Sequence, residues 1–583
     1  MTTTRRGWVA FVLVVLVALV GSGCTVIPLS GPNTLSEPGT GDPLTKPFQR
    51  MIALPPQPTW GPEEVIKGLQ AAMAAYADDP TILPQYLTPE ARSKWSPSGP
   101  VTVIEDAYDF AYPSERDGTQ TVQKITVKGR WAASIKEDDA YVPTGGAWDR
   151  SFELVKVADG GYRVSSLPTG LGLLLTNSDV ARAYRATNLY YVSGNTPDRL
   201  VVDRVRLRLK PTKSFAQIIL ERLLEQPTSA LQGGAVTSSF PQGTKVEYVV
   251  WREERVVVNL SRPLDPLDPS AKAAVKAQIR YSLNMNEVAK GRTIDIQVDG
   301  EPYSLDQPDT DDQWLEDGDA DPYFVSRGAI QYLGKDGPAG TVPGPAGQER
   351  TGYRDFALSK DNNALVAART STGISVAGLT QAGQWQEVIQ GDLTAPSWHR
   401  DGSLWTFDRK NGAALRYDPA GGRGPERVEA EVKLQGLDVT RLRIARDGVR
   451  VVLSIGENTV QICALAGNGA GAKLVNFQSL ATTGEGERII DLAWADDEHL
   501  LMLVESDAGQ ILNQINVGDG ETVGVPLKDR LQSLAGSGDR VLAWSRTGSG
   551  ADIKSKIVEL NQDRQTWTPK VESDASTPLF PLG

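Results

Sequence analysis

The sequence predicts an exported multidomain protein in which two α+β domains precede an all-β propeller. Three observations predict this fold class. A short apolar segment near the N-terminus ends at a cysteine. Helical periodicity is followed by strand alternation in two regions between residues 59 and 306. A strand–turn–strand unit then recurs about every 40–50 residues.

The composition is that of a folded, acidic protein. Of the 583 residues, 40% are hydrophobic and 23% are charged, which is ordinary for globular chains and sufficient for several cores. The net charge of −12 repels phosphate backbones, so we expect no general nucleic-acid binding. The two cysteines are Cys24 and Cys463, and lipid on the first would exclude an internal disulfide.

Residues 1–23 are organised as a lipoprotein signal peptide. Arg5 and Arg6 precede the apolar run Trp8–Val20, which is shorter than the roughly 20 residues that span a bilayer. The following Gly21-Ser22-Gly23-Cys24 resembles the bacterial lipobox, except that Leu is usual at the position of Gly21. We therefore predict lipid on Cys24 and anchoring at the extracytoplasmic face of the cell membrane. The alternative is an uncleaved anchor with an incidental cysteine.

The first folded region, residues 59–175, follows a flexible tether. Residues 24–58 are rich in Pro, Gly, Ser and Thr and cannot bury enough apolar surface to order themselves. Positions 65, 69, 72, 73 and 76 then form one apolar helix face, and Thr88 and Pro89 begin a second helix. Strand patterns follow at 121–135, 147–157 and 162–167. This layout resembles the α+β cone of nuclear transport factor 2.

The second region, residues 176–306, predicts the order β-α-β-β-α-β. Residues 201–210 alternate between apolar and basic side chains, as in a half-buried strand. Ser214 and Gln217 predict a capping box at one helix, and Ser270 is the expected cap of another. A hairpin over 246–250 and 256–260 separates these helices, and a strand over 294–298 ends the region.

The third region, residues 307–583, is repetitive. An aspartate in a turn precedes an apolar strand at five points, namely Asp361, Asp401, Asp447, Asp496 and Asp539. Propeller blades repeat at this spacing and bury their faces only against neighbours, so the set must close into a ring. We expect a sixth unit from residues 323–333 with the C-terminal segment 558–567, and a loop over 337–347. The repeated aspartates are interpreted as turn formers.

The order of these parts resembles the LpqB family of actinobacterial lipoproteins along essentially the full chain. The resemblance is carried by Gly23-Cys24, by residues 86–91 (YLTPEA), and by 231–234 (LQGG) and 237–244 (TSSFPQGT). The middle domain resembles the GerMN module. The resemblance implies a protein that works with the extracellular domain of a sensor histidine kinase, MtrB. That kinase belongs to a two-component system concerned with cell-envelope homeostasis and division.

The motifs of several catalytic and metal sites are missing from the sequence. His399 and His499 cannot supply an H-E-x-x-H zinc site, and neither a G-x-S-x-G nucleophile elbow nor a phosphate-binding P-loop occurs. Acid clusters at 309–312 and 316–321 would suit glycoside hydrolysis or calcium, but their position between domains favours a solvated linker. We predict no catalytic residue, metal or cofactor. The alternative class is an envelope protein that binds or processes glycan through propeller carboxylates.

One charged stripe is a candidate for partner binding. Arg204, Arg206, Arg208 and Lys210 occupy alternate positions of the strand over 201–210 in an otherwise acidic protein. Like charges at this spacing repel one another, so a neighbouring anion would stabilise them. A partner of this stripe would be anionic: lipid headgroups, cell-wall polymer or an acidic face of the kinase. The alternative is a solvated strand face with acids from adjacent strands nearby.

Overall fold

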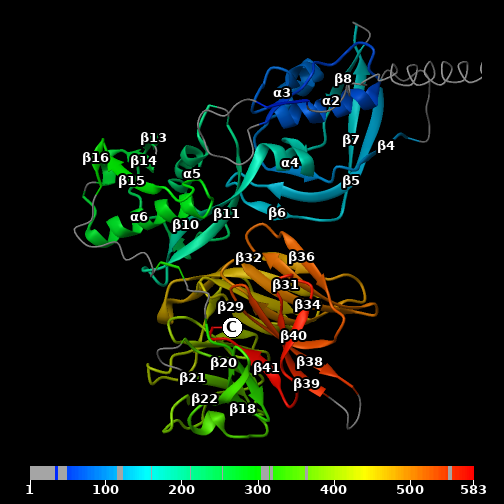
Figure 1. Cartoon of the computed structure of the whole chain (residues 1–583). Helices are drawn as coiled ribbons and strands as arrows, with labels where there is room; N and C mark the ends of the chain where they lie inside the picture. The colour runs from blue at the N-terminus through cyan, green and yellow to red at the C-terminus, as the bar shows by residue number, and fades with distance from the viewer. Residues whose placement is uncertain are drawn as a thin grey trace, which may run out of the picture.

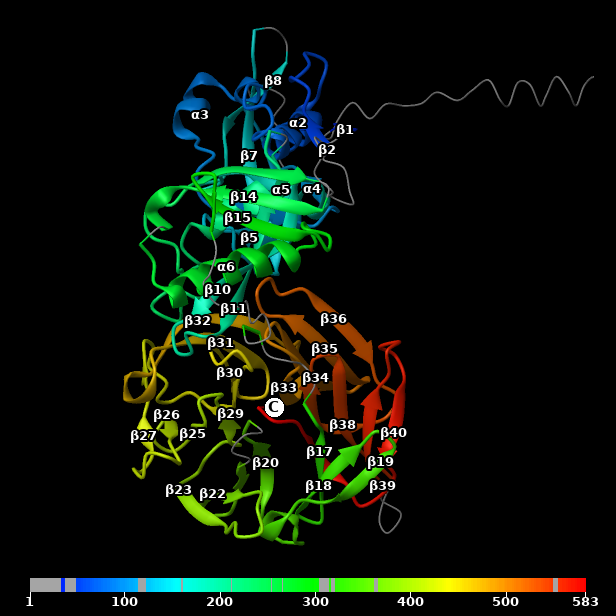
Figure 2. The same ribbon diagram turned by 60° about the vertical axis from the view of Figure 1, so that its left-hand side comes forward.

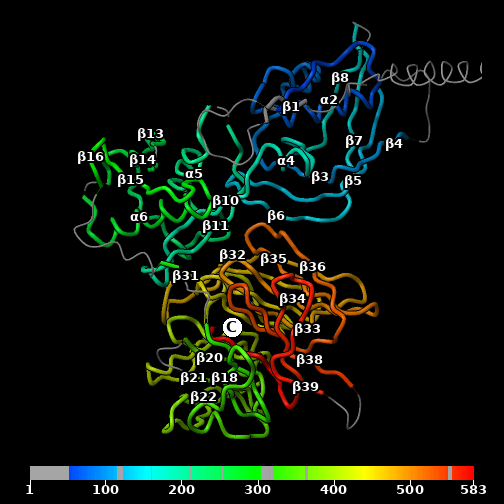
Figure 3. Tube along the Cα trace, in the orientation of Figure 1, coloured from blue at the N-terminus to red at the C-terminus, as the bar shows by residue number. Residues whose placement is uncertain are grey.

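The computed structural model describes residues 33–36, 49–113, 122–158, 161–210, 212–252, 254–264, 266–303, 314–315, 320–360, 365–548 and 554–582. These residues form a first domain, a middle domain and a propeller (Figure 1). The first and middle domains both face the side of the propeller where β31 (Thr459–Ala466), β32 (Lys473–Thr482) and β35 (Gly509–Asn516) lie (Figure 3). Cys24 and most of the two acid clusters lie outside the described residues.

The first domain packs helices against a mostly antiparallel sheet. Its central strand β5 (Val122–Ile135) pairs with β3 (Val101–Ile104), β4 (Asp109–Ala111), β6 (Tyr141–Pro143) and β7 (Ala147–Lys156). The edge strands are β8 (Tyr162–Ser166) and β9 (Leu174–Thr176). One core joins this sheet to α2 (Pro62–Ala75), η1 (Leu83–Tyr86) and α3 (Pro89–Lys94). The likeness to the nuclear transport factor 2 cone stays a prediction.

The first domain begins before residue 59. β2 (Gln49–Ile52) pairs with β1 (Asn33–Ser36), and Met51 is fully buried in the core that contains α2. The N–H of Met51 donates to Oδ2 of Asp78 at 3.2 Å. The last part of the predicted tether is therefore structured, because its apolar side chains fit the core of the domain.

The middle domain has two sheets and two helices around one core. β10 (Tyr184–Ser193) pairs with β11 (Leu200–Arg208) and β12 (Val236–Thr237). The second sheet has the order β13 (Val246–Arg252), β14 (Arg255–Leu260), β15 (Thr293–Val298) and β16 (Glu301–Pro302). The core also includes α5 (Phe215–Leu223) and α6 (Pro269–Asn284), and α4 (Asn177–Ala183) leads in from the first domain.

Several details differ from the predicted β-α-β-β-α-β arrangement, which also lacks the short strands β12 and β16. β10 is an additional strand, and because its last five residues are all buried, no apolar–polar alternation marks it. Asp268 caps α6 in place of Ser270, since Pro269 takes the first helical position and Oδ1 of Asp268 accepts the Ala271 N–H at 2.9 Å. At α5, Ser214 accepts the Gln217 N–H at 3.2 Å, but the Gln217 side chain donates to Glu221.

The propeller comprises six sheets within the described residues, set around a ring (Figure 2). The second and third sheets contain β20 (Arg354–Leu358), β21 (Leu365–Arg369), β22 (Gly373–Gly378), β23 (Gln386–Gln390), β24 (Ser397–Trp398), β25 (Leu404–Asp408), β26 (Ala413–Tyr417) and β27 (Glu426–Arg427). The fourth sheet contains β28 (Glu429–Ala430), β29 (Val439–Ile444), β30 (Arg450–Ile455), β31 (Thr459–Ala466) and β32 (Lys473–Thr482). The fifth and sixth contain β33 (Arg488–Trp494), β34 (His499–Ser506), β35 (Gly509–Asn516), β36 (Thr522–Pro526), β37 (Leu531–Ser537), β38 (Arg540–Thr547), β39 (Lys554–Leu560) and β40 (Trp567–Val571).

The first sheet closes the ring with strands from both ends of the propeller region. β17 (Tyr323–Ser326), β18 (Ala329–Gly334) and β19 (Gly337–Thr341) are joined by β41 (Ser576–Leu579), which also contacts the inner strands β20 and β37. The C-terminal contribution is therefore β41, and residues 558–567 belong to the sixth sheet instead. The stretch 337–347 is not a simple loop, because it contains β19 and the short helix η4 (Gly344–Gly347).

Three repeated aspartates form turns as predicted. Oδ1 of Asp401, Asp447 and Asp496 accepts the backbone N–H two residues later at 2.7–2.8 Å. The Asp539 side chain is exposed, and Asp361 lies outside the described residues. The repeat signal in the sequence therefore comes from local hydrogen bonding at the start of a strand.

Candidate functional site at the domain junction

The basic stripe of β11 lies where the middle domain meets the propeller. Val205 and Leu207 are buried in the middle-domain core, so the alternate arginines point away from it. Nε of Arg204 donates to Oδ2 of Asp519 at 2.6 Å, and Nη2 of Arg206 donates to the same oxygen at 2.8 Å. Because the Asp519 side chain is fully buried, two middle-domain arginines enclose one propeller carboxylate.

Glycines on both sides of Asp519 allow this close approach. A Cβ at Gly518 would lie 2.6 Å from the Cβ of Arg204. A Cβ at Gly520 would lie 2.2 Å from Cγ of Pro143 in the first domain, and Gly520 has a φ of +69°. A side chain at either position would collide with a neighbouring domain, so this turn is shaped for the junction.

Two further arginines attach the first domain. Nη2 of Arg208 lies 3.4 Å from Oδ2 of Asp78, just beyond α2. On α5, Arg222 is buried, and its Nε donates to Oδ2 of Asp139 at 2.9 Å. Its Nη2 donates to the Asp138 carbonyl at 2.7 Å. The middle domain therefore uses arginines to hold both of its neighbours.

The chain itself supplies carboxylates to three of the four stripe residues. Arg204, Arg206 and Arg208 lie in contacts between domains, and Lys210 is exposed. Alternation along the strand predicts the direction of these side chains but not what lies opposite. The acidic partners are 130 to 317 residues away in sequence and leave no local pattern. The nearest usable signal is the turn at 518–520, where glycines flank an aspartate.

Polar contacts at the base of the propeller complete the junction. Arg450 donates from Nη1 to Asp447 at 2.6 Å and from Nη2 to the Val202 carbonyl of β11. Nδ2 of Asn195 donates to the Gly448 carbonyl at 2.7 Å. The contacts with Val202 and Asn195 exist only while the domains are docked, so undocking would leave the Val202 carbonyl and the Asn195 amide to be solvated by water.

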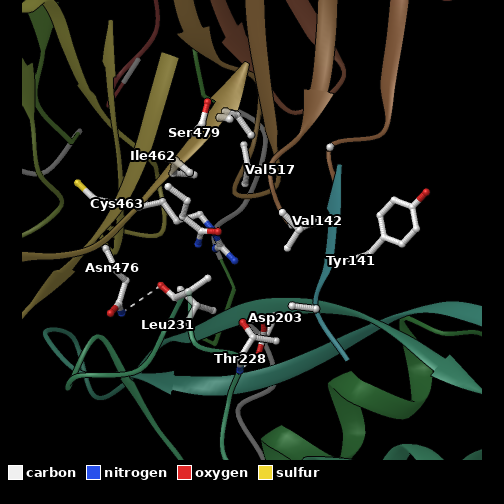
Figure 4. A pocket seen from close by; sticks show the side chains of 18 of the residues that line it. Tyr141, Val142, Asp203, Thr228, Leu231, Ile462, Cys463, Asn476, Ser479 and Val517 are labelled. Carbon is white, nitrogen blue, oxygen red and sulfur yellow. Dashed lines mark hydrogen bonds between the residues drawn. The ribbon is translucent and has the colours of Figure 1, made fainter. Parts of the chain in front are cut away.

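A small cavity lies where the three domains meet (Figure 4). Its volume of about 70 Å³ holds a few water molecules and not a cofactor. Asp203 of β11 lies on its wall and accepts hydrogen bonds from the N–H and Oγ1 of Thr228 at 2.7 and 2.8 Å. Cys463 of β31 also lines it, and burial strongly raises the pKa of that thiol. The cavity is a feature of domain packing.

Several titratable groups near this junction have shifted pKa values. Burial and the nearby Asp447 carboxylate raise the pKa of Asp497 to about 7. Burial also raises the pKa of Asp203 and of Glu498, which accepts a hydrogen bond from Asn188 of the middle domain at 2.7 Å. Burial alone would lower the pKa of His499, but its contact with Asp496 outweighs this and raises it. The charge of the junction therefore changes near neutral pH.

His399 lies in the turn between β24 and β25, and His499 is the first residue of β34. Nε2 of His399 lies 2.8 Å from the Gly448 carbonyl, and Nδ1 of His499 lies 2.9 Å from the Asp496 carboxylate. In the part of the chain that the structure describes, no group of three or more His, Cys, Asp or Glu side chains is placed to hold a metal ion. Nor does any helix there have the length and apolarity needed to cross a membrane.

Three protein-family models match the chain. The model described as "Lipoprotein LpqB, N-terminal domain" matches residues 55–181. "Sporulation and spore germination" matches residues 188–304, and "Lipoprotein LpqB beta-propeller domain" matches residues 333–581. The matches follow one another in the order of the three domains.

The chain is similar over most of its length to proteins named Lipoprotein LpqB. The relative from Thermobifida fusca (strain YX) is 27% identical, with 97% of both chains covered. The relative from Streptomyces coelicolor is 28% identical, covering 86% of this chain and 87% of that one. These relatives are named as lipoproteins and not as enzymes.

Among solved structures, a chain of the nidogen/laminin complex is similar to this protein, with a TM-score of 0.32 and 12% sequence identity. The similarity covers 45% of this chain and 98% of that chain. The Cps50 (Swd1) beta-propeller domain of Myceliophteria thermophila has a TM-score of 0.26 and 13% identity, covering 34% and 69%.

Proposed function

Because the chain is a member of the LpqB family of actinobacterial lipoproteins, we propose that it is a membrane-anchored protein that binds and modulates a sensor histidine kinase resembling MtrB. Through that kinase it would affect cell-envelope homeostasis and division. The observation that carries the proposal is the similarity, over 97% of both chains, to a relative named Lipoprotein LpqB. A role in binding, and not in catalysis, agrees with relatives that are named as lipoproteins and not as enzymes.

The proposed anchor is lipid on Cys24, at the extracytoplasmic face of the membrane. Two or three acyl chains attach a protein stably, whereas one gives only marginal binding. Replacing Cys24 with Ala should abolish incorporation of a labelled fatty acid and leave the precursor unprocessed. Equal labelling of this variant and the unaltered chain would contradict the lipobox interpretation.

The arrangement of domains supports a protein that extends from a membrane toward a partner. β2, near the start of the described chain, lies on the part of the first domain that is remote from the propeller (Figures 1 and 2). A tether before β2 would place the propeller farthest from the membrane. The salt bridges of Arg204, Arg206 and Arg222 hold the three domains together, so a partner would meet a preformed surface.

We expect the kinase to contact the propeller and not the basic stripe, because three of the four stripe residues already have partners within the chain. The extracellular domain of the kinase is immobilised and titrated with the detergent-solubilised chain. Saturable binding is expected. Lys210→Glu, which alters the exposed member of the stripe, should leave both the affinity and its salt dependence unchanged.

Two outcomes would count against the proposal. One is the lack of saturable binding to the kinase domain by a chain whose fold is confirmed by circular dichroism. The other is retention on, or release of products from, peptidoglycan or arabinogalactan fragments without kinase binding. That second outcome would favour the glycan-binding or glycan-processing class.

A further inference from the structure

Charged side chains from neighbouring blades converge on Arg443 of β29. Its Nη1 donates to the carbonyl of Pro396 at 3.3 Å, immediately before β24 of the third sheet. Four charged groups of the second, fourth and fifth sheets act on its guanidinium, namely Asp355, Arg369, Arg441 and Asp491. Groups from four consecutive sheets meet only where the inner strands approach one another, so Arg443 lies near the axis of the ring.

Two of the three arginines at this point already have a carboxylate partner. Nε of Arg369 donates to Oδ2 of Asp355 at 2.6 Å, and its Nη1 donates to the Leu393 carbonyl at 3.0 Å. Nε of Arg441 lies 3.5 Å from Oδ1 of Asp491. The contacts of Arg369 with the Leu393 carbonyl and of Arg441 with Asp491 link the inner parts of adjacent sheets. With three arginines and two carboxylates, the group retains one positive charge in excess.

Arg443 is the arginine without a carboxylate. None lies within salt-bridge distance of it among the described residues, and its Nη1 donates only to the carbonyls of Pro396 and Leu442, at 3.3 and 3.4 Å. Its Nε and Nη2 have no hydrogen-bond partner in the described ranges. The side chain is half-buried, and desolvation lowers the pKa of Arg443. A desolvated guanidinium with no carboxylate in direct contact is unfavourable, and an oxyanion in its fork would relieve this.

We propose that the propeller binds an oxyanion at Arg443, as a carboxylate or phosphate group carried by an envelope molecule. Arg369 and Arg441 use their guanidinium groups to hold neighbouring strands and contribute positive potential, while Nε and Nη2 of Arg443 remain for the ligand. Either oxyanion matches the planar arginine fork. This site is separate from the domain junction and does not depend on the proposed kinase interaction.

Thermal unfolding of the detergent-solubilised full chain tests this site. Sodium phosphate, acetate and chloride are compared at constant ionic strength, so that general screening is equal. A ligand that binds only the folded protein raises the unfolding midpoint in a saturable way, by about 2–4 °C at several times its Kd. A rise with phosphate indicates a phosphate-bearing ligand, and a rise with acetate indicates a carboxylate. No saturable difference between either salt and chloride would overturn the proposal.

Matched variants separate anion binding from strand stabilisation. Arg443→Gln should abolish the anion-dependent rise, and Arg443→Lys should keep part of it, since lysine retains the charge but not the fork. Arg423→Gln changes the charge equally at an exposed position between β26 and β27 and should keep the full rise. An equal rise in Arg443→Gln and Arg423→Gln would overturn the proposal. If Arg443→Gln does not fold, an undiminished rise in Arg443→Lys would overturn it.

Discussion

Asp497 illustrates how a single carboxylate can make the domain junction sensitive to pH. Its Oδ1 is buried and has no hydrogen-bond partner among the described residues. Burial and the charge of Asp447 and Asp496 raise its pKa, while Arg400 and Arg450 act in the opposite direction. The result is a pKa of about 7, so this carboxyl group is partly protonated at neutral pH.

Stability should fall with rising pH because of this group. An unfolded Asp titrates near pH 3.9, so between about 4 and 7 the native state keeps a proton that the unfolded state has lost. The free energy of unfolding therefore decreases through this window, and the loss is complete above about pH 7. Asp497→Asn should raise the free energy of unfolding by about 1–2 kcal/mol at pH 8 and by little at pH 4.

Urea unfolding at both pH values measures this effect. Asp539→Asn is the control, because the Asp539 side chain is exposed and its removal should matter little at either pH. If Asp497→Asn changes stability equally at pH 4 and pH 8, titration of this carboxyl is not the cause.

At the scale of elements, the sequence predicts strands that are marked by apolar–polar alternation or by a preceding aspartate turn, and it misses strands that have neither mark. The alternation over 201–210 predicts β11 and the outward direction of its arginines, and Thr88 caps α3 as expected, accepting the Ala91 N–H at 3.2 Å. β10 and β41 are missed for physical reasons. The last half of β10 is buried throughout, and β41 is a four-residue strand that contains a proline and is defined by its pairing with β17.

Ring closure should depend strongly on Phe580, which follows β41. Its side chain is fully buried in a cluster with Phe324 of the first sheet and Leu542 of the sixth. Phe580→Ala should lower the free energy of propeller unfolding by about 3–5 kcal/mol, because it removes apolar contacts and leaves a cavity at the closing contact. Urea unfolding followed by limited proteolysis would locate the loss in the propeller.

Val523→Ala is the matched control for that substitution. Val523 lies on β36 and is 58% exposed, so its truncation should change stability by no more than about 0.5 kcal/mol. Equal protease resistance of the propeller in Phe580→Ala and Val523→Ala would contradict a closure that depends on β41.

At the scale of the whole molecule, the junction holds together domains that would otherwise be expected to move. Domains joined within one chain commonly shift relative to one another unless their interface is extensive. Here the middle domain contacts the first domain through Arg208 and Arg222, and the propeller through Arg204 and Arg206. The basic stripe could be recognised from the sequence, but its role could not, because contacts between distant segments exist only after each domain has folded.

Asp519 is the residue on which propeller docking should depend most. Asp519→Asn keeps the size of the side chain but removes the charge that Arg204 and Arg206 share, leaving Arg206 without a carboxylate and Arg204 with only the exposed Glu521. Docking should weaken by about 2–3 kcal/mol while each domain stays folded. Small-angle X-ray scattering should then show a larger radius of gyration, and hydrogen exchange should increase at β11.

Glu521→Gln, at a side chain that is 61% exposed and 3.2 Å from Arg204, should change docking by less than about 1 kcal/mol. Identical scattering from Asp519→Asn and Glu521→Gln would mean that packing at the junction, and not this carboxylate, holds the propeller in place.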